Sequence, residues 1–450
     1  MRNVVSRRSW VVGVVMVAAA CGSSGSGDGV AGADGGGVAG DAGSPDSAAG
    51  AGGAAGGGGS SAGTGTGGGP LGGTGGAGAG AGGFGGSGGG AAASGAAGAA
   101  ATSGASGARG ASGVDGGAGA SGAGGGAGAS GADAGADAPP PGTAAACFAG
   151  QFVHPTELGP DYDQFSPTIG SHCKGTNHQD IQGVERVVFL GDSVTVGTPP
   201  WLALDYYRVK LAGALAQRFG LTPPGLLWNN VNVIDGVVLQ QESGDFASCS
   251  KWGARTDDFL RSDGQIPGCF TEASRQKKTL VVMTMGGNDV AAITKSGLDG
   301  KPIPDIWQDV YQFVQYQREA VTWLTDPVNF PNGSYVVFAN MFEFTDGTGD
   351  VTACPAAGLA GFGAAWSDPT ILADMVIYAN EQFMDIAVDT GTDMIFMLES
   401  FCGHGFNAAD PTSPCYRGPN TPQWFDLTCI HPNPTGHSAL ADLFAATIAE

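Results

Sequence analysis

The chain has 450 residues, of which 83 are glycine, and a formal net charge of -22 at pH 7. With 19 Lys and Arg against 41 Asp and Glu, it lacks the clustered positive charge that binding to a phosphate backbone requires, so nucleic acid is excluded as a partner. We attribute the acidity to solubility outside the cell, and the sign of the charge alone does not identify a substrate.

The N-terminus has the composition of an export signal. Three arginines precede the apolar residues 10–20, which end in the sequence VAAAC at Cys21. A basic segment before a short apolar run is typical of a secretory signal, and the run is shorter than the roughly 20 residues that span a bilayer. VAAAC resembles a bacterial lipobox. This resemblance implies that residues 1–20 are removed and that lipidated Cys21 anchors the exported protein to a membrane; an ordinary signal peptide is the alternative.

Two segments of very different composition follow. Residues 21–146 are rich in Gly, Ala and Ser and cannot bury enough apolar surface to offset the entropy of ordering, so we predict a disordered tether. Residues 147–450 carry nearly all the aromatic residues and cysteines. They are sufficient for one domain, and residues 147–180 form an irregular N-terminal cap.

Eight cysteines remain after Cys21, and an even set in an exported chain predicts disulfides. No two of them show the CxxC spacing of a structural zinc site. Eight cysteines allow 105 connectivities, so the pairing is a hypothesis. We expect neighbours along the chain to pair: Cys147–Cys173, Cys249–Cys269, Cys354–Cys402 and Cys415–Cys429.

Short apolar, β-branched runs alternate with segments of helical periodicity. The runs lack polar alternation, as strands buried on both faces of a parallel sheet do. Alternating strands and helices predict a three-layer α/β/α sandwich around a mostly parallel, five-stranded sheet, with ligands beyond the carboxyl ends of the strands. The predicted strands are 186–191, 231–235, 279–286, 335–341 and 393–398, and the predicted helices are 201–219, 304–323, 369–384 and 436–449.

Three polar residues follow or flank these elements. Ser193, in FLGDSVTVG, lies on the turn after the first strand, where a following helix N-terminus favours negative charge on a nucleophile. Asn288, in TMGGNDV, follows the third run and can present its amide to an oxyanion. His431, in CIHPNPTGH, precedes the last helix. Each alone also fits an ordinary cap or turn.

Together, the blocks GDS, GxND and HP resemble those of the SGNH (GDSL-like) hydrolase family, over Val184 to Glu450. The resemblance implies a flavodoxin-like fold and a serine esterase or lipase. Ser193 is then the nucleophile and its amide an oxyanion donor. Asn288 is a second donor, and His431 is the base that takes the serine proton and returns it to the leaving alcohol.

The second block of the family is a glycine that supplies a third oxyanion donor. Gly253 in SKWGARTDDF matches it best, although Gly236 and Gly244 also follow the second predicted strand.

The sequence departs from the family three residues before the histidine, where an acid is usual and Thr428 stands. Asp426 lies two residues further back. Either Asp426 reaches the imidazole, or a backbone carbonyl such as that of Thr428 orients His431 in a Ser-His dyad. A solvated loop residue is the third interpretation of Asp426.

We therefore expect an exported, lipid-anchored, monomeric carboxylester hydrolase that needs no metal or organic cofactor. Its substrate is an ester of a lipid or of an acylated carbohydrate, and it touches the membrane through the anchor only. The alternative is a catalytically silent module of the same fold that binds glycan or a surface partner.

Overall fold

The computed structural model describes residues 142–154 and 159–450. The predicted signal peptide, the lipidation site at Cys21 and the tether up to residue 141 lie outside the described residues. Helix α1 (Ala144–Phe148) begins three residues before the expected start of the domain at Cys147, and Thr143 caps it.

A six-stranded sheet forms the centre, in the order β4-β5-β1-β6-β7-β8. Five strands run parallel, and β4 pairs antiparallel with β5 at one edge. Among the parallel strands the second lies beside the first and the third lies on its other side, which is the doubly wound order predicted for a flavodoxin-like sheet. The strands are β1 (Arg186–Gly191), β4 (Glu242–Ser243), β5 (Phe246–Ser248), β6 (Thr279–Thr284), β7 (Ser334–Ala339) and β8 (Asp393–Ile395).

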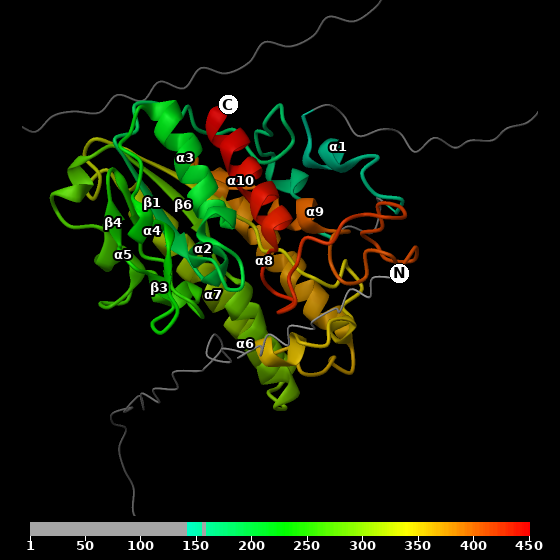
Figure 1. The fold of residues 1–450 in the computed structure, drawn as a ribbon. Helices are drawn as coiled ribbons and strands as arrows, with labels where there is room; N and C mark the ends of the chain where they lie inside the picture. Colours follow the sequence, from blue (N-terminus) through cyan, green and yellow to red (C-terminus); the bar gives the residue numbers. More distant parts are fainter. Residues whose placement is uncertain (1–141, 155–158) are drawn as a thin grey trace, which may run out of the picture. The chain divides into compact units, whose positions relative to one another are not determined.

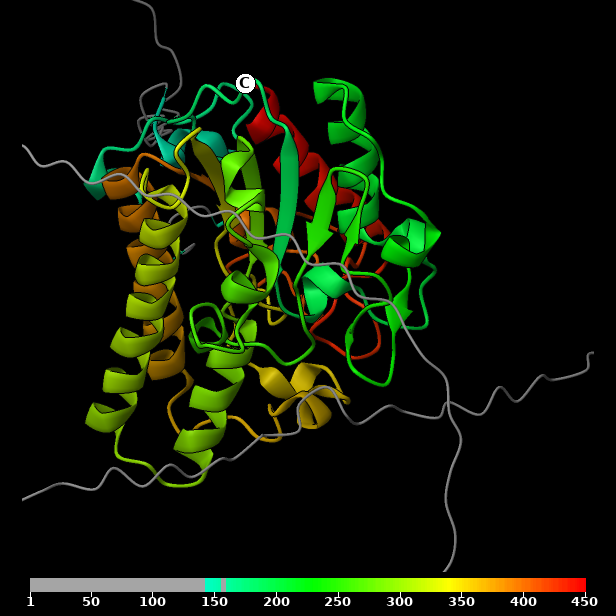
Figure 2. The same cartoon turned by 90° about the vertical axis from the view of Figure 1, so that its left-hand side faces the viewer.

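Helices cover both faces of this sheet (Figure 1). Figure 2 shows the strands between two helix pairs, α7 with α8 and α3 with α10. The structure thus has the predicted three layers, and the four predicted long helices all form. The helices are α2 (Ser193–Val196), α3 (Tyr207–Phe219), α4 (Leu226–Asn229), α5 (Gln265–Cys269), α6 (Gly287–Leu298), α7 (Ile303–Thr325), α8 (Pro369–Thr390), α9 (Met397–Phe401) and α10 (Pro434–Ala449).

Alternate side chains of the central strands enter opposite layers. In β1, Val188 and Leu190 pack with α7 and α8, whereas Val187 and Phe189 pack with α3 and α10. Each fully buried side chain of this size contributes about 1.5–3 kcal/mol. Burial on both faces explains why the strand sequences lack polar alternation.

The prediction of the second sheet strand at residues 231–235 is wrong. Val231–Asn232 (β2) pairs instead with Val237–Val238 (β3) in a separate antiparallel hairpin, where Ile234 is 90% exposed. Phe246–Ser248 occupies the place beside β1. This strand is buried and only three residues long, too short for its pattern to be recognised, whereas the β-branched run has the stronger local propensity.

The N-terminal cap packs onto the β8 side of the sheet. Phe148 and Tyr162 both contact Phe396, with ring centroids 5.2 and 5.7 Å away. Gly175 forms an antiparallel bridge with Ile395 of β8. The cap therefore covers a sheet edge that would otherwise present unpaired backbone groups.

All eight predicted cysteines form disulfides, but two of the four expected pairs are wrong. Cys147–Cys173 and Cys249–Cys269 form as expected. The other two bridges are Cys354–Cys429 and Cys402–Cys415. Proximity along the chain cannot predict Cys354–Cys429, which joins residues 75 apart that only the folded chain brings together.

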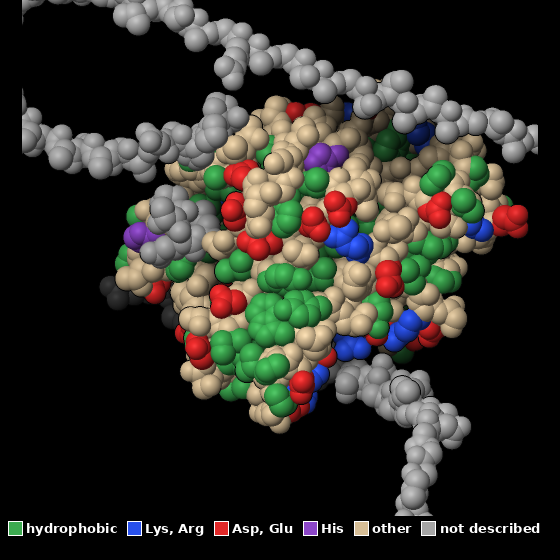
Figure 3. Space-filling model, turned by 180° about the vertical axis from the view of Figure 1, so that it is seen from behind, with side chains coloured by type: hydrophobic (Ala, Val, Ile, Leu, Met, Phe, Trp, Pro, Cys, Tyr) green, Lys and Arg blue, Asp and Glu red, His purple; other side chains and the backbone are tan. Residues whose placement is uncertain are grey.

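Lys and Arg side chains do not gather on the face shown in Figure 3, where they lie singly among acidic ones. Elsewhere in the described residues, basic side chains also pair with acidic ones, as Lys301 does with Asp309 and Arg318 with Asp385. Among the helices of the described residues, none combines the length and the hydrophobicity needed to cross a bilayer.

The contributions of Cys354–Cys429 and Cys402–Cys415 to the free energy of unfolding can be measured separately. Loop-closure entropy gives about 4.5 kcal/mol for the 75-residue loop of Cys354–Cys429 and about 3 kcal/mol for the 13-residue loop of Cys402–Cys415. We expect the double Cys→Ala variant of the first pair to lose more free energy of unfolding in urea than that of the second. Equal losses would contradict this, and peptide mapping without reductant checks the pairing itself.

Candidate active site

Ser193 lies at the point where β1 turns into α2. The Asp192 side chain accepts a hydrogen bond from the amide of Val194 (2.9 Å) and so caps this helix. Gly191 has a φ of 141°, and a Cβ there would clash with the carbonyl oxygen of Thr284. A glycine is thus required for the sharp turn that places Ser193 at the end of the sheet.

His431 lies directly beside this serine. Its Nε2 is 2.8 Å from Ser193 Oγ, and both residues are buried. On the other side of the ring, Nδ1 is 2.7 Å from the hydroxyl oxygen of Thr428. That hydroxyl is in turn 2.5 Å from Oδ1 of Asp426. The four side chains therefore form one continuous chain of hydrogen bonds.

The loop that carries His431 is closed upon itself. Phe425 and Pro432 form an antiparallel bridge at its base, and the amide of Asp426 donates to the carbonyl of His431 (2.9 Å). Cys429, at its tip, is tied to Cys354. These contacts restrict the position of the imidazole without any contact from substrate.

Burial sets the protonation states in this chain. It lowers the pKa of His431 to about 4, so the ring is neutral at physiological pH and can accept a proton. Burial also raises the pKa of Asp426, against the hydrogen bonds from the hydroxyl and the amide of Thr428, which lower it. The pKa of Asp192 rises to about 7 for the same reason, desolvation.

The second and third predicted blocks meet beside Ser193. Asn288 begins the first turn of α6 and donates from its amide to the carbonyl of Ala254 (2.9 Å), the residue after Gly253. The loop that carries Gly253 is held to β1, because the amide of Lys251 donates a hydrogen bond to the carbonyl of Gly191 (3.0 Å). Gly253 has a φ of 75°, in the region that favours glycine.

Asp289 reinforces this junction. Its carboxylate accepts hydrogen bonds from the amide and the hydroxyl of Thr256, the latter at 2.9 Å. Ser193 and Asn288 both line an apolar cavity beside this junction. Gly253 does not line it.

A cavity of about 200 Å³ opens at Ser193, and its lining is mostly apolar. Its walls come from the start of α6, from residues 341–349 after β7, and from α8. The apolar residues that line it include Val290, Ala291, Met341, Phe342, Phe344, Leu372, Ala373, Val376, Ile377 and Ile430.

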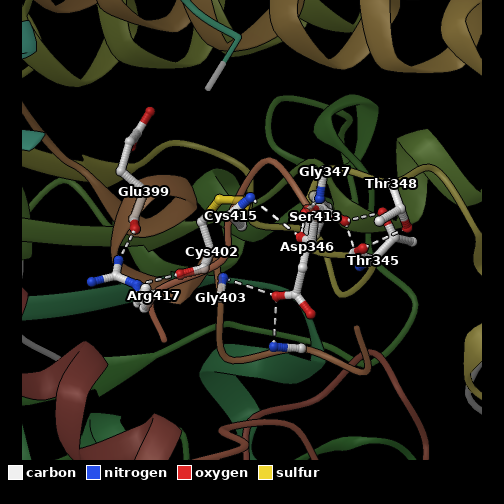
Figure 4. The surroundings of a disulfide bond; sticks show 12 residues. Thr345, Asp346, Gly347, Thr348, Glu399, Cys402, Gly403, Ser413, Cys415 and Arg417 are labelled. Atoms are coloured by element: carbon white, nitrogen blue, oxygen red, sulfur yellow. Dashed lines mark hydrogen bonds between the residues drawn. A yellow bond between two sulfur atoms is a disulfide. The ribbon is translucent and has the colours of Figure 1, made fainter. Parts of the chain in front are cut away.

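A buried carboxylate holds one wall of this cavity. Asp346 accepts hydrogen bonds from the amides of Gly403 (2.9 Å), Gly405 (2.8 Å) and Asn407 (2.8 Å). Figure 4 shows Asp346 beside the Cys402–Cys415 disulfide, with the hydroxyl of Ser413 bonded to its backbone carbonyl. The 343–349 segment is therefore fixed to the loop after α9. Within the described residues, no three His, Cys, Asp or Glu side chains converge as a metal site would require.

The structure places His431 and Asp426 close to Ser193, and Asn288 lines the same cavity as Ser193. Neither of the two expected partners of Nδ1, the Thr428 carbonyl and the Asp426 carboxylate, contacts that nitrogen. The side-chain hydroxyl of Thr428, rather than its carbonyl or the Asp426 carboxylate, bonds to Nδ1. The spacing D-x-T-x-x-H could have indicated this. No sequence signal marked the cavity, because its walls come from distant segments.

Three solved structures are similar to this chain at low identity. An extracellular lipase from Streptomyces rimosus is 16% identical, over 58% of this chain and 98% of that one, with a TM-score of 0.35. A gut microbial diltiazem-metabolizing enzyme is 15% identical over 61% and 49% (TM-score 0.36). A lipolytic G-D-S-L family protein from Veillonella parvula is 13% identical over 57% and 94% (TM-score 0.31).

Among curated proteins, none matches the chain. The profile of the family described as GDSL-like Lipase/Acylhydrolase matches residues 187–444, a span that contains the three polar blocks and all of the parallel sheet except the first residue of β1. Because this match covers more than half of the sequence, the protein belongs to the GDSL-like lipase/acylhydrolase family.

Proposed function

We propose that the protein is an exported, lipid-anchored serine carboxylester hydrolase that works through an acyl-enzyme on Ser193. The observation that carries the proposal is the 2.8 Å contact between Ser193 Oγ and Nε2 of a neutral, buried His431. With Nδ1 donating to Thr428, Nε2 is free of hydrogen and accepts the serine proton as Oγ attacks the ester carbonyl.

The same histidine serves both halves of the reaction. Protonated His431 gives its proton to the departing alcohol, which leaves an ester between Ser193 and the acyl group. Water then adds to this ester with His431 again as base, and the acid is released. The amides of Ser193 and Gly253 and the side chain of Asn288 are the donors that stabilise the tetrahedral oxyanion.

The apolar cavity favours an acyl group of several carbons. A chain placed along α8 would bury its methylenes against Leu372, Ala373 and Val376, at about 0.8 kcal/mol per buried CH₂. An acetyl group would leave this volume unused. Of the two expected substrates, the lipid ester therefore fits the described site better than an acetylated carbohydrate.

Export and lipidation rest on the N-terminal sequence. The four disulfides of the described residues suit an oxidising compartment. Metabolic labelling with a fatty-acid analogue, lost in Cys21→Ala, tests the anchor.

Replacing the nucleophile separates an enzyme from a binding module. We expect the Ser193→Ala variant to lose hydrolysis of p-nitrophenyl esters by at least about 10⁴-fold, because the residual rate comes only from binding and oxyanion donors. A fluorophosphonate should label the parent but not the variant. A folded parent with neither turnover nor labelling would favour the silent binding module.

Filling the cavity tests the acyl assignment. We expect Ala373→Phe to lower kcat/KM for p-nitrophenyl octanoate by about tenfold or more while changing the acetate ester by less than about twofold, since only the longer chain needs the space. Ala214→Phe, at an exposed position of α3, is the matched control. Equal effects of Ala373→Phe on both esters would refute the assignment.

The pH profile follows from the burial of His431. Protonated imidazole cannot accept the serine proton, so activity is lost as pH falls through the His431 pKa of about 4. We expect kcat/KM to be full above about pH 5 and to fall about tenfold per unit below the pKa, with circular dichroism verifying the fold at each pH. An acid limb near the unperturbed value of about 6.5 would contradict the buried, neutral base.

A further inference from the structure

We propose that Thr428 is a positioning residue that couples the Asp426 carboxylate to His431 through its side-chain hydroxyl. This inference rests on the proposed function and deepens it. The Ser-His pair then belongs to a four-membered chain, Ser193–His431–Thr428–Asp426, in which a neutral hydroxyl stands between the base and the acid.

The hydrogens along this chain are determined by the donors available. The amide and the hydroxyl of Thr428 both lie against Oδ1 of Asp426, at 2.8 and 2.5 Å. A carboxylate has no hydrogen to donate, so the hydroxyl donates to Asp426 and its lone pair accepts Nδ1–H of His431. This arrangement keeps Nε2 unprotonated, which is the tautomer that the attack by Ser193 requires.

A simple turn explains the Asp–Thr bonds but not the contact with His431. In a D-x-T turn the aspartate accepts from both the amide and the hydroxyl two residues later. The described residues form three others, in which the aspartate is exposed or half-buried: Asp350–Thr352, Asp368–Thr370 and Asp410–Thr412.

Among these four turns, only that of Asp426 combines a buried aspartate with a threonine hydroxyl in contact with an imidazole, and Thr428 itself is exposed. Asp426 is 4% exposed and His431 is also 4% exposed, and the Thr428 hydroxyl has a second partner in Nδ1 at 2.7 Å. Because Asp426 and His431 are themselves buried, the imidazolium that forms during attack is stabilised by its hydrogen bond to a hydroxyl that the carboxylate polarises. No proton needs to move along the relay; the positive ring is stabilised where it forms.

The other ionisable groups near His431 do not replace this stabilisation. His437 on α10 interacts with His431 electrostatically, and burial lowers its pKa to about 3, so it is neutral. Asp192, at the start of α2, bonds to the amide of Val194. Among the described residues, the Thr428 hydroxyl is the only hydrogen-bond partner of Nδ1.

The test is a set of variants of the full chain, assayed with p-nitrophenyl esters. We expect Thr428→Val to lower kcat by about 10- to 100-fold with KM nearly unchanged, since the relay acts only when charge develops; direct loss of a triad carboxylate costs about 10⁴-fold. Thr428→Ser, which keeps the hydroxyl, should remain within about threefold of the parent. Asp426→Asn should resemble Thr428→Val, and the double variant should be no worse than either.

The pH profile distinguishes a relay from a merely structural turn. Without the hydroxyl or the carboxylate, the imidazolium loses stabilisation, so the acid limb of kcat/KM should move to lower pH. Thr428→Asp puts a carboxylate next to Nδ1, which stabilises the imidazolium, so it should move the acid limb of kcat/KM to higher pH. Thr412→Val breaks a D-x-T turn that faces no histidine, and it should change neither kcat nor the position of the acid limb of kcat/KM.

Two outcomes overturn the proposal separately from the function. If Thr428→Val keeps full activity while Ser193→Ala is inactive, the relay is refuted and the esterase stands. If Thr428→Ser is as damaged as Thr428→Val, the hydroxyl has no such role. The proton NMR signal of His431 Nδ1–H tests the hydrogen bond to Thr428 even if no tested ester is hydrolysed. We expect a low-field signal in the parent, and we expect Thr428→Val to lose this signal or to shift it upfield.

Discussion

Strands β1 and β6 pair in parallel up to Gly191 opposite Thr284, and the relative position of Ser193 and Asn288 depends on this register. The chain reverses its winding direction between these two strands, so the turns after them diverge and leave space at the carboxyl edge. Ser193 follows one strand and Asn288 the other. A shift of the pairing would separate them and remove the junction that Asp289 and Thr256 form beneath.

Burial then gives these groups their chemistry. His431 would be partly protonated at neutral pH if it were exposed, but desolvation holds it neutral. The cost of burying His431 and Oδ1 of Asp426 is offset in part by their hydrogen bonds with the Thr428 hydroxyl, whereas Oδ2 of Asp426 is buried without a hydrogen-bond partner among the described residues. The same desolvation strengthens each hydrogen bond when charge appears on the ring.

The walls around the site are held by long-range links rather than by the sheet. Cys354–Cys429 restrains the histidine loop, and Cys402–Cys415 with Asp346 restrains the segment after β7 that lines the cavity. A cavity enclosed by irregular segments needs such links, because loops without them open at little free-energy cost. The shape of this cavity therefore depends on these links.

The sequence by itself determined the layered α/β architecture and four of the five parallel strands, because local hydrophobic runs carry that information. Its short motifs also singled out Ser193, Asn288 and His431 as the candidate site residues. It did not determine that Phe246–Ser248 rather than residues 231–235 joins β1, since three buried residues have no readable period and the competing run has the higher propensity. Tertiary structure also decided the partner of Cys429, the cavity, and the orientation of His431 by the Thr428 hydroxyl. Each of these depends on distances between segments far apart in the chain or on where a side chain points, and neither is encoded in local pattern.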